Sequence, residues 1–372
     1  MSGDIHAFTM PKWGLTMEKG TLTAWYKDVG DEVAAGEEIC DVETEKIANG
    51  VEAPIGGVLR RQVASAGNEL PIGALLGIIA DESVPDADIA AAVEKFQAEY
   101  VPPEPGEGAE AEQPEHIEVA GRRFRHLLHR GDGDAIVLVH GFGGNLENWL
   151  LNHAALCEGG RTVAALDLPG HGESTKALQS GSLDELSSAV LAYMDAADIE
   201  QAHLVGHSMG AAICMAVARK APDRVKSLSL LAPAGLGQPV DSAFIQGFVE
   251  ATRRKQLKPV LQKLFADPEL VTRQLVDDTL KYKRLEGVTE ALQALADGAI
   301  GESAGLQALA GLAGKRPVSV MWGEHDAVIA APDERSFSDA GIELHLLPGV
   351  GHMAMVEAAD EVNRLIGALI DR

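Results

Sequence analysis

Positively charged residues are scarce in this 372-residue chain. It has 31 Lys and Arg against 56 Asp and Glu, which gives a net charge of −25. Proteins that bind nucleic acids need clustered Lys and Arg to neutralise phosphates, and docking on anionic lipid needs the same residues. The charge balance therefore argues against both classes. Aromatic residues are also few, at 4%, whereas hydrophobic residues make up 46%, so we expect a large and mainly aliphatic core.

Two further kinds of feature are missing. No run approaches the roughly 20 apolar residues of a membrane span, and the first nine residues, which include Asp4 and His6, lack the apolar centre of a secretory signal. The three cysteines, Cys40, Cys157 and Cys214, are far apart and follow no metal-ligand spacing. We therefore expect a cytoplasmic protein with reduced thiols, no bound metal and no membrane association.

The chain is long enough for two domains, and its composition changes along its length. Residues 4–80 consist of short strand-like runs between Gly, Pro and charged turns, which predicts a small all-β domain. Residues 81–115 are rich in Pro and acidic side chains and predict a linker, with one brief helix expected over residues 86–100. Over residues 116–372 apolar strand-like runs alternate with helical segments, which predicts a doubly wound, mostly parallel sheet. Residues 235–315 contain no convincing strand, so we expect a helical cap over the carboxyl edge of this sheet.

The sequence Gly-His-Ser-Met-Gly at residues 206–210 is the strongest motif of the second domain. It follows a strand-like run and precedes a helical stretch, which is the setting of a nucleophile elbow. The turn is sharp, so small residues are needed around it, and it raises the serine hydroxyl to the top of the sheet. We therefore predict that Ser208 is a nucleophile.

A serine nucleophile needs partners, because it is weak unless a base takes its proton. Asp326 and His352 each follow a strand-like apolar run. We predict that His352 is the base and that Asp326 orients it and stabilises its protonated form. Glu324 and His325 are nearby alternatives for the acid and the base, and the position after a strand end favours Asp326 and His352.

The order serine, aspartate, histidine along the chain resembles that of the α/β-hydrolase family. The Gly-rich sequence His-Gly-Phe-Gly-Gly at residues 140–144 also matches that family, which places such a loop beside the nucleophile. The resemblance covers residues 116–372 and implies an α/β-hydrolase fold. It further implies that the backbone N–H groups of Phe142 and Met209 form an oxyanion hole.

The first domain contains a second strong motif. Lys46 lies in the sequence Glu-Thr-Glu-Lys-Ile-Ala, in a turn expected between two strands, with Gly30 before it and Gly57 after it. This pattern and the opening segment at residues 11–18 resemble biotinyl/lipoyl domains, in which a lysine at a hairpin tip is modified. Biotin acceptors usually have Met on both sides of the lysine, whereas this lysine lies between Glu and Ile. The resemblance therefore implies lipoate bound covalently to Lys46.

A lipoyl domain joined to an α/β hydrolase is similar to the E2 subunits of bacterial acetoin dehydrogenase complexes. That resemblance implies a thiamine-diphosphate E1 that loads an acetyl group, transfer to coenzyme A by this chain, and a flavoprotein E3 that reoxidises the arm. It also implies a lipoate ligase and a homo-oligomer. Other 2-oxo-acid dehydrogenase E2 chains have an H-x-x-x-D-G motif and a basic subunit-binding domain. Here the nearest motif, at residues 129–133, is one residue short, and residues 81–115 are acidic.

The residues leave the chemical route open. Either Ser208 carries the acetyl group as an ester before coenzyme A attacks, or His352 assists direct transfer between two thiols. The alternative functions are an esterase or thioesterase that carries a lipoyl domain, and a lipoyl carrier scaffold with a non-catalytic hydrolase-like domain. The complete order of nucleophile, acid and base argues against the scaffold. Nothing in the triad separates transfer to a thiol from transfer to water.

Overall fold

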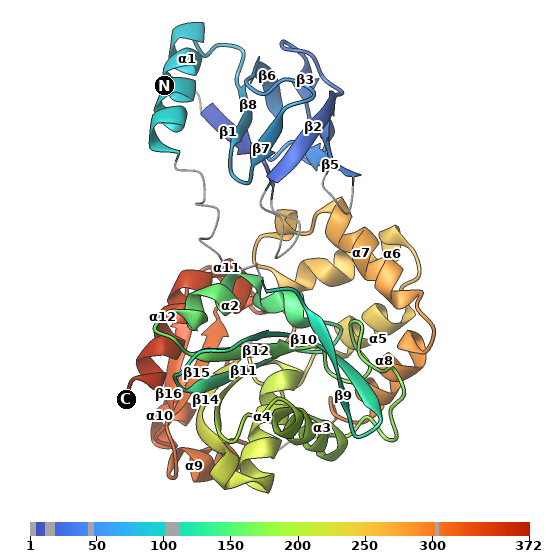
Figure 1. Ribbon diagram of the computed structural model, residues 1–372, viewed down its shortest axis with the longest axis vertical. Helices are drawn as coiled ribbons and strands as arrows, with labels where there is room; N and C mark the ends of the chain where they lie inside the picture. The colour runs from blue at the N-terminus through green and yellow to red at the C-terminus, as the bar shows by residue number, and fades with distance from the viewer. Residues whose placement is uncertain (1–4, 12–18, 44–47, 101–111, 302–304) are drawn as a thin grey trace. The chain divides into compact units, whose positions relative to one another are not determined.

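The computed structural model describes residues 5–11, 19–43, 48–100, 112–301 and 305–372. The chain divides into two compact units, Met1–Gln113 and Pro114–Arg372 (Figure 1). Within the described residues, no helix has the length and apolar character needed to cross a membrane.

The first unit is a small all-β structure, as the sequence predicts. One sheet has the strand order β1 (Ile5–Thr9), β8 (Leu75–Ala80), β6 (Gly57–Gln62) and β3 (Glu32–Val33). The other sheet has the order β5 (Ala48–Glu52), β4 (Glu38–Glu43), β2 (Lys19–Trp25) and β7 (Glu69–Pro71). Side chains from both sheets form one aliphatic core, which includes Leu22, Ile39, Val42, Leu59 and Ile79. Burial of this apolar area stabilises the unit.

The expected helix after the last strand is present as α1 (Asp86–Glu99). Ile89, Val93 and Phe96 form its apolar face, and they pack with Ile78 of β8. Just beyond the helix, the Tyr100 hydroxyl donates a hydrogen bond to the carbonyl of Ile72, at 2.8 Å. The first part of the expected linker therefore folds onto the first unit, because its apolar face is large enough to be buried there. Residues 101–111 lie outside the described residues.

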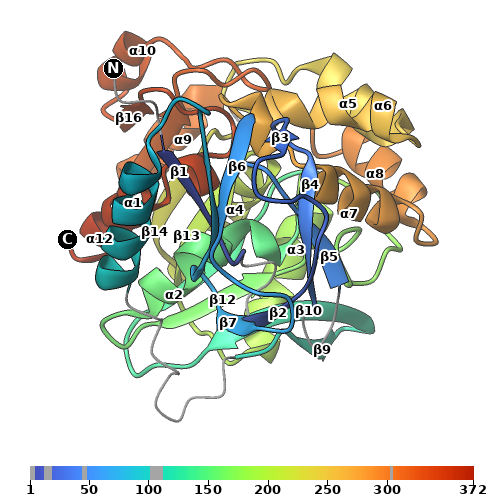
Figure 2. The same ribbon diagram turned by 90° about the horizontal axis from the view of Figure 1, so that it is seen from above.

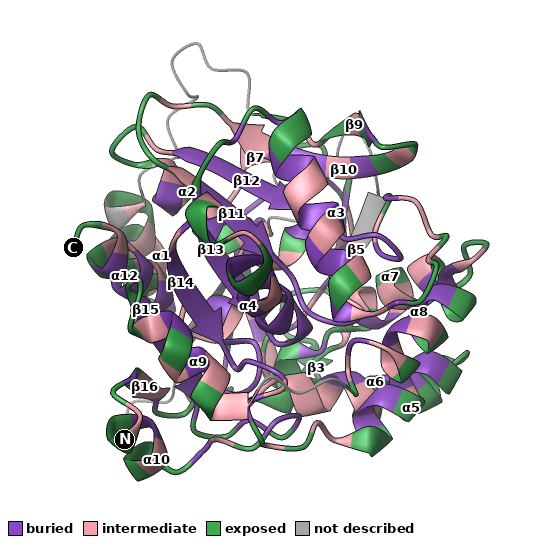
Figure 3. Cartoon of the chain, turned by 90° about the horizontal axis from the view of Figure 1, so that it is seen from below, coloured by how far each residue is buried: buried purple, intermediate pink, exposed green. Residues whose placement is uncertain are grey.

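The second unit is built on an eight-stranded sheet. Its order is β16 (Glu343–Leu347), β15 (Val318–Gly323), β14 (Val225–Leu231), β13 (Ala202–His207), β11 (Ala135–Val139), β12 (Thr162–Leu166), β10 (Arg122–His129) and β9 (Glu115–Val119). All pairs from β16 to β12 are parallel, and β10 and β9 form an antiparallel hairpin at one edge. Strands β12, β13 and β15 are buried along their whole length (Figure 3). This explains their continuous apolar sequences, because both faces of the sheet are covered.

Helices cover both faces of this sheet (Figure 1). On one face, α3 (Leu183–Ala196) packs against α4 (Met209–Lys220), and α4 contacts α9 (Gly305–Ala313). On the other face, α2 (Leu150–Cys157) packs against α12 (Ala359–Ile370) and α11 (Ala354–Glu357). Helix α10 (Glu334–Asp339) contacts β16. The predicted doubly wound arrangement is therefore confirmed.

The predicted helical insertion lies between β14 and β15. Its helices beside α9 are α5 (Ser242–Glu250), α6 (Arg254–Leu261), α7 (Arg273–Lys283) and α8 (Val288–Asp297), with short 3-10 helices at Gln262–Leu264 and Pro268–Leu270. Two further 3-10 helices occur outside it, at Leu146–Trp149 and Pro222–Arg224. Figure 2 shows α5, α6, α7 and α8 gathered as one group of helices. The described residues between β14 and β15 contain no strand, in agreement with the sequence prediction.

Candidate active site

Ser208 occupies the sharp turn between β13 and α4. Its backbone has φ +53° and ψ −116°, a conformation that L-residues rarely adopt. The flanking glycines are required by close packing. A Cβ at Gly206 would lie 2.6 Å from the Cα of Ala211, and one at Gly210 would lie 2.2 Å from the carbonyl oxygen of Val139. The strand, turn and helix of the predicted nucleophile elbow are therefore all present.

His352 and Asp326 come together at the ends of neighbouring strands. Gly323 of β15 lies opposite Leu347 of β16, so the loops that follow these strands leave the sheet side by side. The His352 Nδ1–H donates to Asp326 Oδ2 at 2.7 Å, and both residues are buried. The carboxylate thereby leaves Nε2 of the neutral imidazole as the free acceptor. This is the geometry required of an orienting acid and a general base.

The carboxylate of Asp326 is itself fixed by the loop that it begins. Its Oδ1 accepts hydrogen bonds from the backbone N–H groups of Val328, at 2.8 Å, and Ile329, at 2.9 Å. The two sequence alternatives are placed differently, because Glu324 and His325 are both exposed. The structure therefore brings Asp326 and His352 together and leaves Glu324 and His325 in solvent.

Ser208 and His352 line one cavity of about 420 Å³. The cap supplies a large part of its wall, with side chains that include Phe244, Phe248, Leu261, Leu264, Leu275 and Tyr282. Among the described residues that line it there is no Lys or Arg. Ser208 and His352 thus face a partly enclosed and mainly apolar space, in which water is less accessible than in bulk solvent and electrostatic interactions are strengthened.

The Gly-rich loop after β11 lies close to Ser208. Val139 of β11 lies opposite Gly206 of β13, which places this loop beside the elbow. A Cβ at Gly141 would lie 2.9 Å from His207 Nδ1 and 3.1 Å from Ser208 Cβ, so a side chain here would require its neighbours to shift. Phe142 follows Gly141 and lines the cavity. Met209 is the first residue of α4, so its backbone N–H has no partner within the helix.

Two buried histidines hold this Gly-rich loop. His140 donates its Nδ1–H to the carbonyl of Gly141 at 2.8 Å and accepts the N–H of Leu168 at Nε2, at 3.0 Å. His171 accepts the N–H of Gly143 at Nε2, at 3.1 Å. Burial lowers the pKa of His140 and lowers the pKa of His171 well below its usual value, so both imidazoles are neutral. From sequence His171 is expected to be only a loop residue, because its partner Gly143 is 28 residues away.

His207 contacts His352 directly, and this contact is not apparent from the sequence. Its Nε2–H donates to the backbone carbonyl of His352 at 3.0 Å, and the two rings lie 4.6 Å apart between centroids. Its Nδ1 is buried and has no hydrogen-bond partner among the residues that the structure describes. Burial, followed by the charge of His352, lowers the pKa of His207 well below its usual value. His207 therefore stays neutral and positions the His352 backbone. The only sequence signal for it is its place in the elbow motif.

Glu357 forms a second support for the His352 loop. Its carboxylate accepts the N–H of Gly351 at 2.9 Å and the N–H of Ala266, in the cap, at 2.8 Å. Burial raises the pKa of this carboxyl group. One partly buried side chain thus connects the loop that carries His352 to the insertion that forms part of the cavity wall.

The predicted lipoyl attachment residue, Lys46, lies outside the described residues. The strands on either side of it are described: β4 and β5 pair in antiparallel fashion, with Glu43 opposite Ala48. A pair of this kind fits the hairpin that a modified lysine requires. None of the three cysteines forms a disulfide, and within the described residues no group of three or more His, Cys, Asp or Glu side chains could hold a metal ion.

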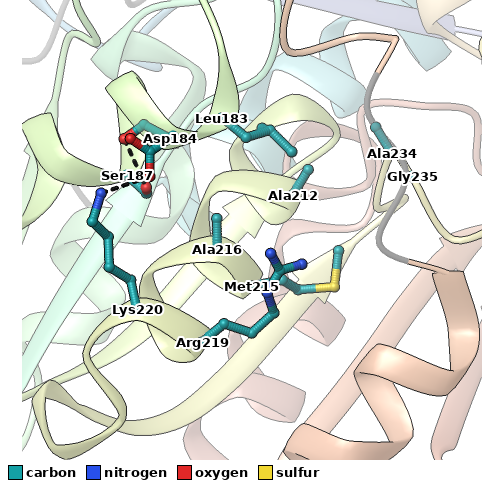
Figure 4. A pocket seen from close by; sticks show the side chains of 10 residues that line it. All are labelled: Leu183, Asp184, Ser187, Ala212, Met215, Ala216, Arg219, Lys220, Ala234 and Gly235. Atoms are coloured by element: carbon teal, nitrogen blue, oxygen red, sulfur yellow. Dashed lines mark hydrogen bonds and ion pairs between the residues drawn. The ribbon is translucent and has the colours of Figure 1, made fainter.

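A second cavity of about 330 Å³ lies between α3 and α4 and shares no lining residue with the first (Figure 4). The figure shows Lys220 reaching across to Asp184, and their Nζ and Oδ1 atoms are 2.7 Å apart. Lys220 also donates to the hydroxyl of Ser188. None of the predicted catalytic residues lines this cavity, so we assign the chemistry to the first one.

Two families match the two units of the chain. The alpha/beta hydrolase fold family matches residues 134–359, and the family described as biotin-requiring enzyme, whose model covers biotin and lipoyl domains, matches residues 6–79. The first match spans more than half of the chain. These matches agree with the all-β first unit and the doubly wound second unit.

Two curated relatives match along almost the whole chain. Both are dihydrolipoyllysine-residue acetyltransferase components of acetoin-cleaving systems. The protein from Pseudomonas putida is 50% identical, with 98% of each chain covered, and that from Cupriavidus necator is 44% identical, with 98% of this chain and 97% of the relative covered. A more distant relative matches 64% of the chain at 28% identity: the 2-hydroxy-6-oxo-6-phenylhexa-2,4-dienoate hydrolase of Comamonas testosteroni, 88% of which is covered.

Solved structures resemble the second unit. A meta-cleavage product hydrolase from Pseudomonas fluorescens IP01 superimposes with a TM-score of 0.62 and 22% identity, covering 69% of this chain and 97% of the hydrolase. At this level of identity the likeness establishes the fold alone.

Proposed function

The chain belongs to the dihydrolipoyllysine-residue acetyltransferase components of acetoin-cleaving systems, and we propose that Ser208 passes an acetyl group from the lipoyl arm of Lys46 to coenzyme A. One observation carries this proposal: relatives that match both units end to end are acetyltransferase components, while the second unit contains a buried Asp326–His352 pair beside Ser208. The lipoyl group, bound to Lys46, would supply the thiol that brings the acetyl group.

The proposed reaction has two halves. In the first, His352 Nε2 takes the proton of Ser208, whose Oγ attacks the carbonyl carbon of the acetyl thioester. The N–H groups of Phe142 and Met209 stabilise the oxyanion. His352 then returns the proton to the departing sulfur, which leaves as the dihydrolipoyl thiol and leaves an acetyl ester on Ser208.

In the second half, the thiol of coenzyme A takes the place of the departed thiol. His352 accepts its proton, and the sulfur attacks the acetyl ester through the same oxyanion. Ser208 leaves with the proton from His352 and is restored. In each half one proton passes through His352 to the leaving group: the Ser208 proton leaves on the dihydrolipoyl thiol, and the proton of coenzyme A restores Ser208. His207 and Glu357 keep the His352 loop in position throughout.

Two features favour thiol over water as the final acceptor. The cavity wall is mainly apolar, and the cap encloses the reacting groups, which disfavours hydrolysis of the ester. Hydrolysis remains the second candidate, because distant relatives of the second unit are hydrolases and the triad serves either acceptor. Direct transfer between thiols, with His352 as base, is the alternative route to the same product.

The assembly follows from the same family membership. We propose that a thiamine-diphosphate E1 loads the arm, that a flavoprotein E3 reoxidises it, and that a lipoate ligase modifies Lys46. A homo-oligomer in the cytoplasm would present several arms to these partners at high effective concentration.

An acyl-enzyme experiment tests the route. Protein mixed with acetyl-dihydrolipoamide in the absence of coenzyme A is quenched with acid and digested, and peptides are analysed by mass spectrometry. We expect an acetyl group on Ser208 that disappears when coenzyme A is added before the quench. Absence of this adduct while acetyl-coenzyme A still forms, in a reaction without ping-pong kinetics, would establish direct transfer instead.

A further inference from the structure

One part of the cap carries positive charge, although the cap as a whole is neutral and the chain is strongly acidic. Residues 251–284 contain nine Lys and Arg against four Asp and Glu, a net charge of +5, whereas the whole chain has −25. The charge is concentrated at α6 and the 3-10 helix after it. Residues 251–266 include five basic side chains and no acidic one: Arg253, Arg254, Lys255, Lys258 and Lys263.

This basic segment also forms part of the cavity wall. Leu261, Leu264 and Phe265 line the cavity that contains Ser208, and each lies within a few residues of Lys258 or Lys263. Helix α6 packs against α7, which contributes further lining residues (Figures 1 and 2). The positive charge is thus attached to the elements that enclose the reacting groups.

Some of these cations already have acidic partners. Arg254 forms a two-fold hydrogen-bonded ion pair with Asp277 of α7, and Lys263 pairs with Asp241. Arg253, Lys255 and Lys258 differ, because all three are exposed and none forms an ion pair within the part of the chain that the structure describes. Lys255 and Lys258 are neighbours on the helix surface, at a spacing where like charges repel.

The cavity itself is unsuited to phosphate. Its described lining has no Lys or Arg, and two of its polar residues are the acidic Glu147 and Asp278. A thiol substrate that carries phosphates can therefore insert only its uncharged arm. Its phosphates must stay outside, where the negative charge of most of the surface would repel them. The positive side chains of the basic cap segment offset this repulsion.

We propose that Arg253, Lys255 and Lys258 bind the phosphates of the nucleotide end of coenzyme A, while its pantetheine arm enters the cavity beside Ser208. This inference rests on the proposed function, since it assigns the nucleotide subsite of that same acceptor. The three side chains supply charge and hydrogen-bond donors to the phosphates and do not contact the reacting atoms.

A double variant, Lys255→Gln with Lys258→Gln, tests the subsite by steady-state kinetics with two acceptors. We expect the KM for coenzyme A to rise about tenfold at low ionic strength, equivalent to ~1.4 kcal/mol. We expect kcat to stay the same, and the KM for pantetheine, which has no nucleotide, to be unchanged. Added salt should raise the wild-type KM for coenzyme A towards the variant value, because it screens exposed charges.

The matched control is Lys315→Gln with Arg372→Gln, which removes two positive charges beside the first residues of β15 and β16. Lys315 precedes β15, and Arg372 pairs with Glu343 at the start of β16. A normal KM for coenzyme A in the cap variant would overturn the proposal, and so would an equal rise with pantetheine or in the control.

Isothermal titration calorimetry with adenosine 3′,5′-bisphosphate measures binding of the nucleotide end alone and does not depend on acyl transfer. We expect binding to wild-type protein and loss of binding in the cap variant. Undetectable binding to the wild type would refute the subsite even if transfer occurs. Binding without any transfer to coenzyme A would instead refute the proposed function and leave the subsite standing.

Discussion

His352 and Asp326 share a 2.7 Å hydrogen bond between Nδ1 and Oδ2, although 26 residues separate them in the chain. Both side chains are almost fully buried, so the bond is formed away from competing water. The carboxylate fixes the tautomer in which Nε2 is free to accept a proton, and it stabilises the imidazolium that follows. The pair therefore has the arrangement that a general base requires.

Replacement of Asp326 by Asn should preserve the fold but present an amide to His352. We expect kcat to fall roughly 10³- to 10⁴-fold, because the wrong tautomer is favoured and the imidazolium loses its partner. KM should change little. Steady-state kinetics of acetyl transfer measure both constants. Glu324→Gln is the matched control, since Glu324 is the exposed alternative in the same loop, and a loss of similar size in that variant would contradict the assignment.

Ser208 also has a measurable effect on stability. Its positive φ costs about 1–3 kcal/mol, and glycine relieves that strain whereas alanine retains it. We expect Ser208→Gly to unfold at a higher temperature than Ser208→Ala, by roughly 2 °C. Scanning calorimetry of the full chain gives the comparison. At Ser188, within α3, the order should be reversed, because glycine is unfavourable in a helix. Equal unfolding temperatures at position 208 would argue against strain.

The buried histidines should make the second unit sensitive to acid. His140, His171 and His207 have a pKa below the usual value of 6.5, so the unfolded chain binds protons that the folded chain does not. Their contribution to the free energy of unfolding is complete above pH 6.5. It is lost as the pH falls below this value, by about 1.4 kcal/mol per pH unit for each histidine. Urea unfolding followed by circular dichroism at pH 7.5, 6.5 and 5.5 measures this slope.

His171→Gln offers the control for that slope, because the glutamine oxygen can accept the N–H of Gly143 without titrating. We expect a shallower loss of stability between pH 6.5 and 5.5 in this variant, by about 1.4 kcal/mol per pH unit. An identical slope in the two proteins would show that His171 is protonated in the folded state.

Lys46→Arg should separate the carrier function from the acetyl transfer itself. Arginine cannot be lipoylated, so the intact mass should no longer increase after expression with lipoate and an active ligase. We expect transfer from free acetyl-dihydrolipoamide to coenzyme A to continue at the wild-type rate. Wild-type protein that stays unmodified under the same conditions would exclude Lys46 as the attachment site.

Local sequence patterns were enough to propose the candidate residues that lie in or directly after a recognisable element. The elbow at residues 206–210 could be found because the sharp turn demands glycines at fixed positions. Asp326 and His352 could be found because they follow strands of a parallel sheet, whose carboxyl ends meet at one edge. The strand-rich first domain was predicted from short runs between Gly, Pro and charged turns, and the helical cap from the lack of strand-like runs over residues 235–315.

Contacts between distant segments could not be predicted in this way. His171 supports Gly143 and His207 supports the His352 carbonyl, and in the sequence each appears as an ordinary histidine. The sheet order, in which β10 pairs with β12, depends on long-range packing for the same reason. Helix α1 was expected, but its packing on β8 reveals that residues 86–99 belong with the first unit.

The most direct test of the central claim follows two products at once. Purified protein is mixed with acetyl-dihydrolipoamide and coenzyme A, and acetyl-coenzyme A and free acetate are measured together for wild type and Ser208→Ala. We predict that acetyl-coenzyme A is the main product of the wild type and that the variant loses its formation. Acetate as the main product in the presence of coenzyme A would contradict the acyltransferase function and identify the second unit as a hydrolase.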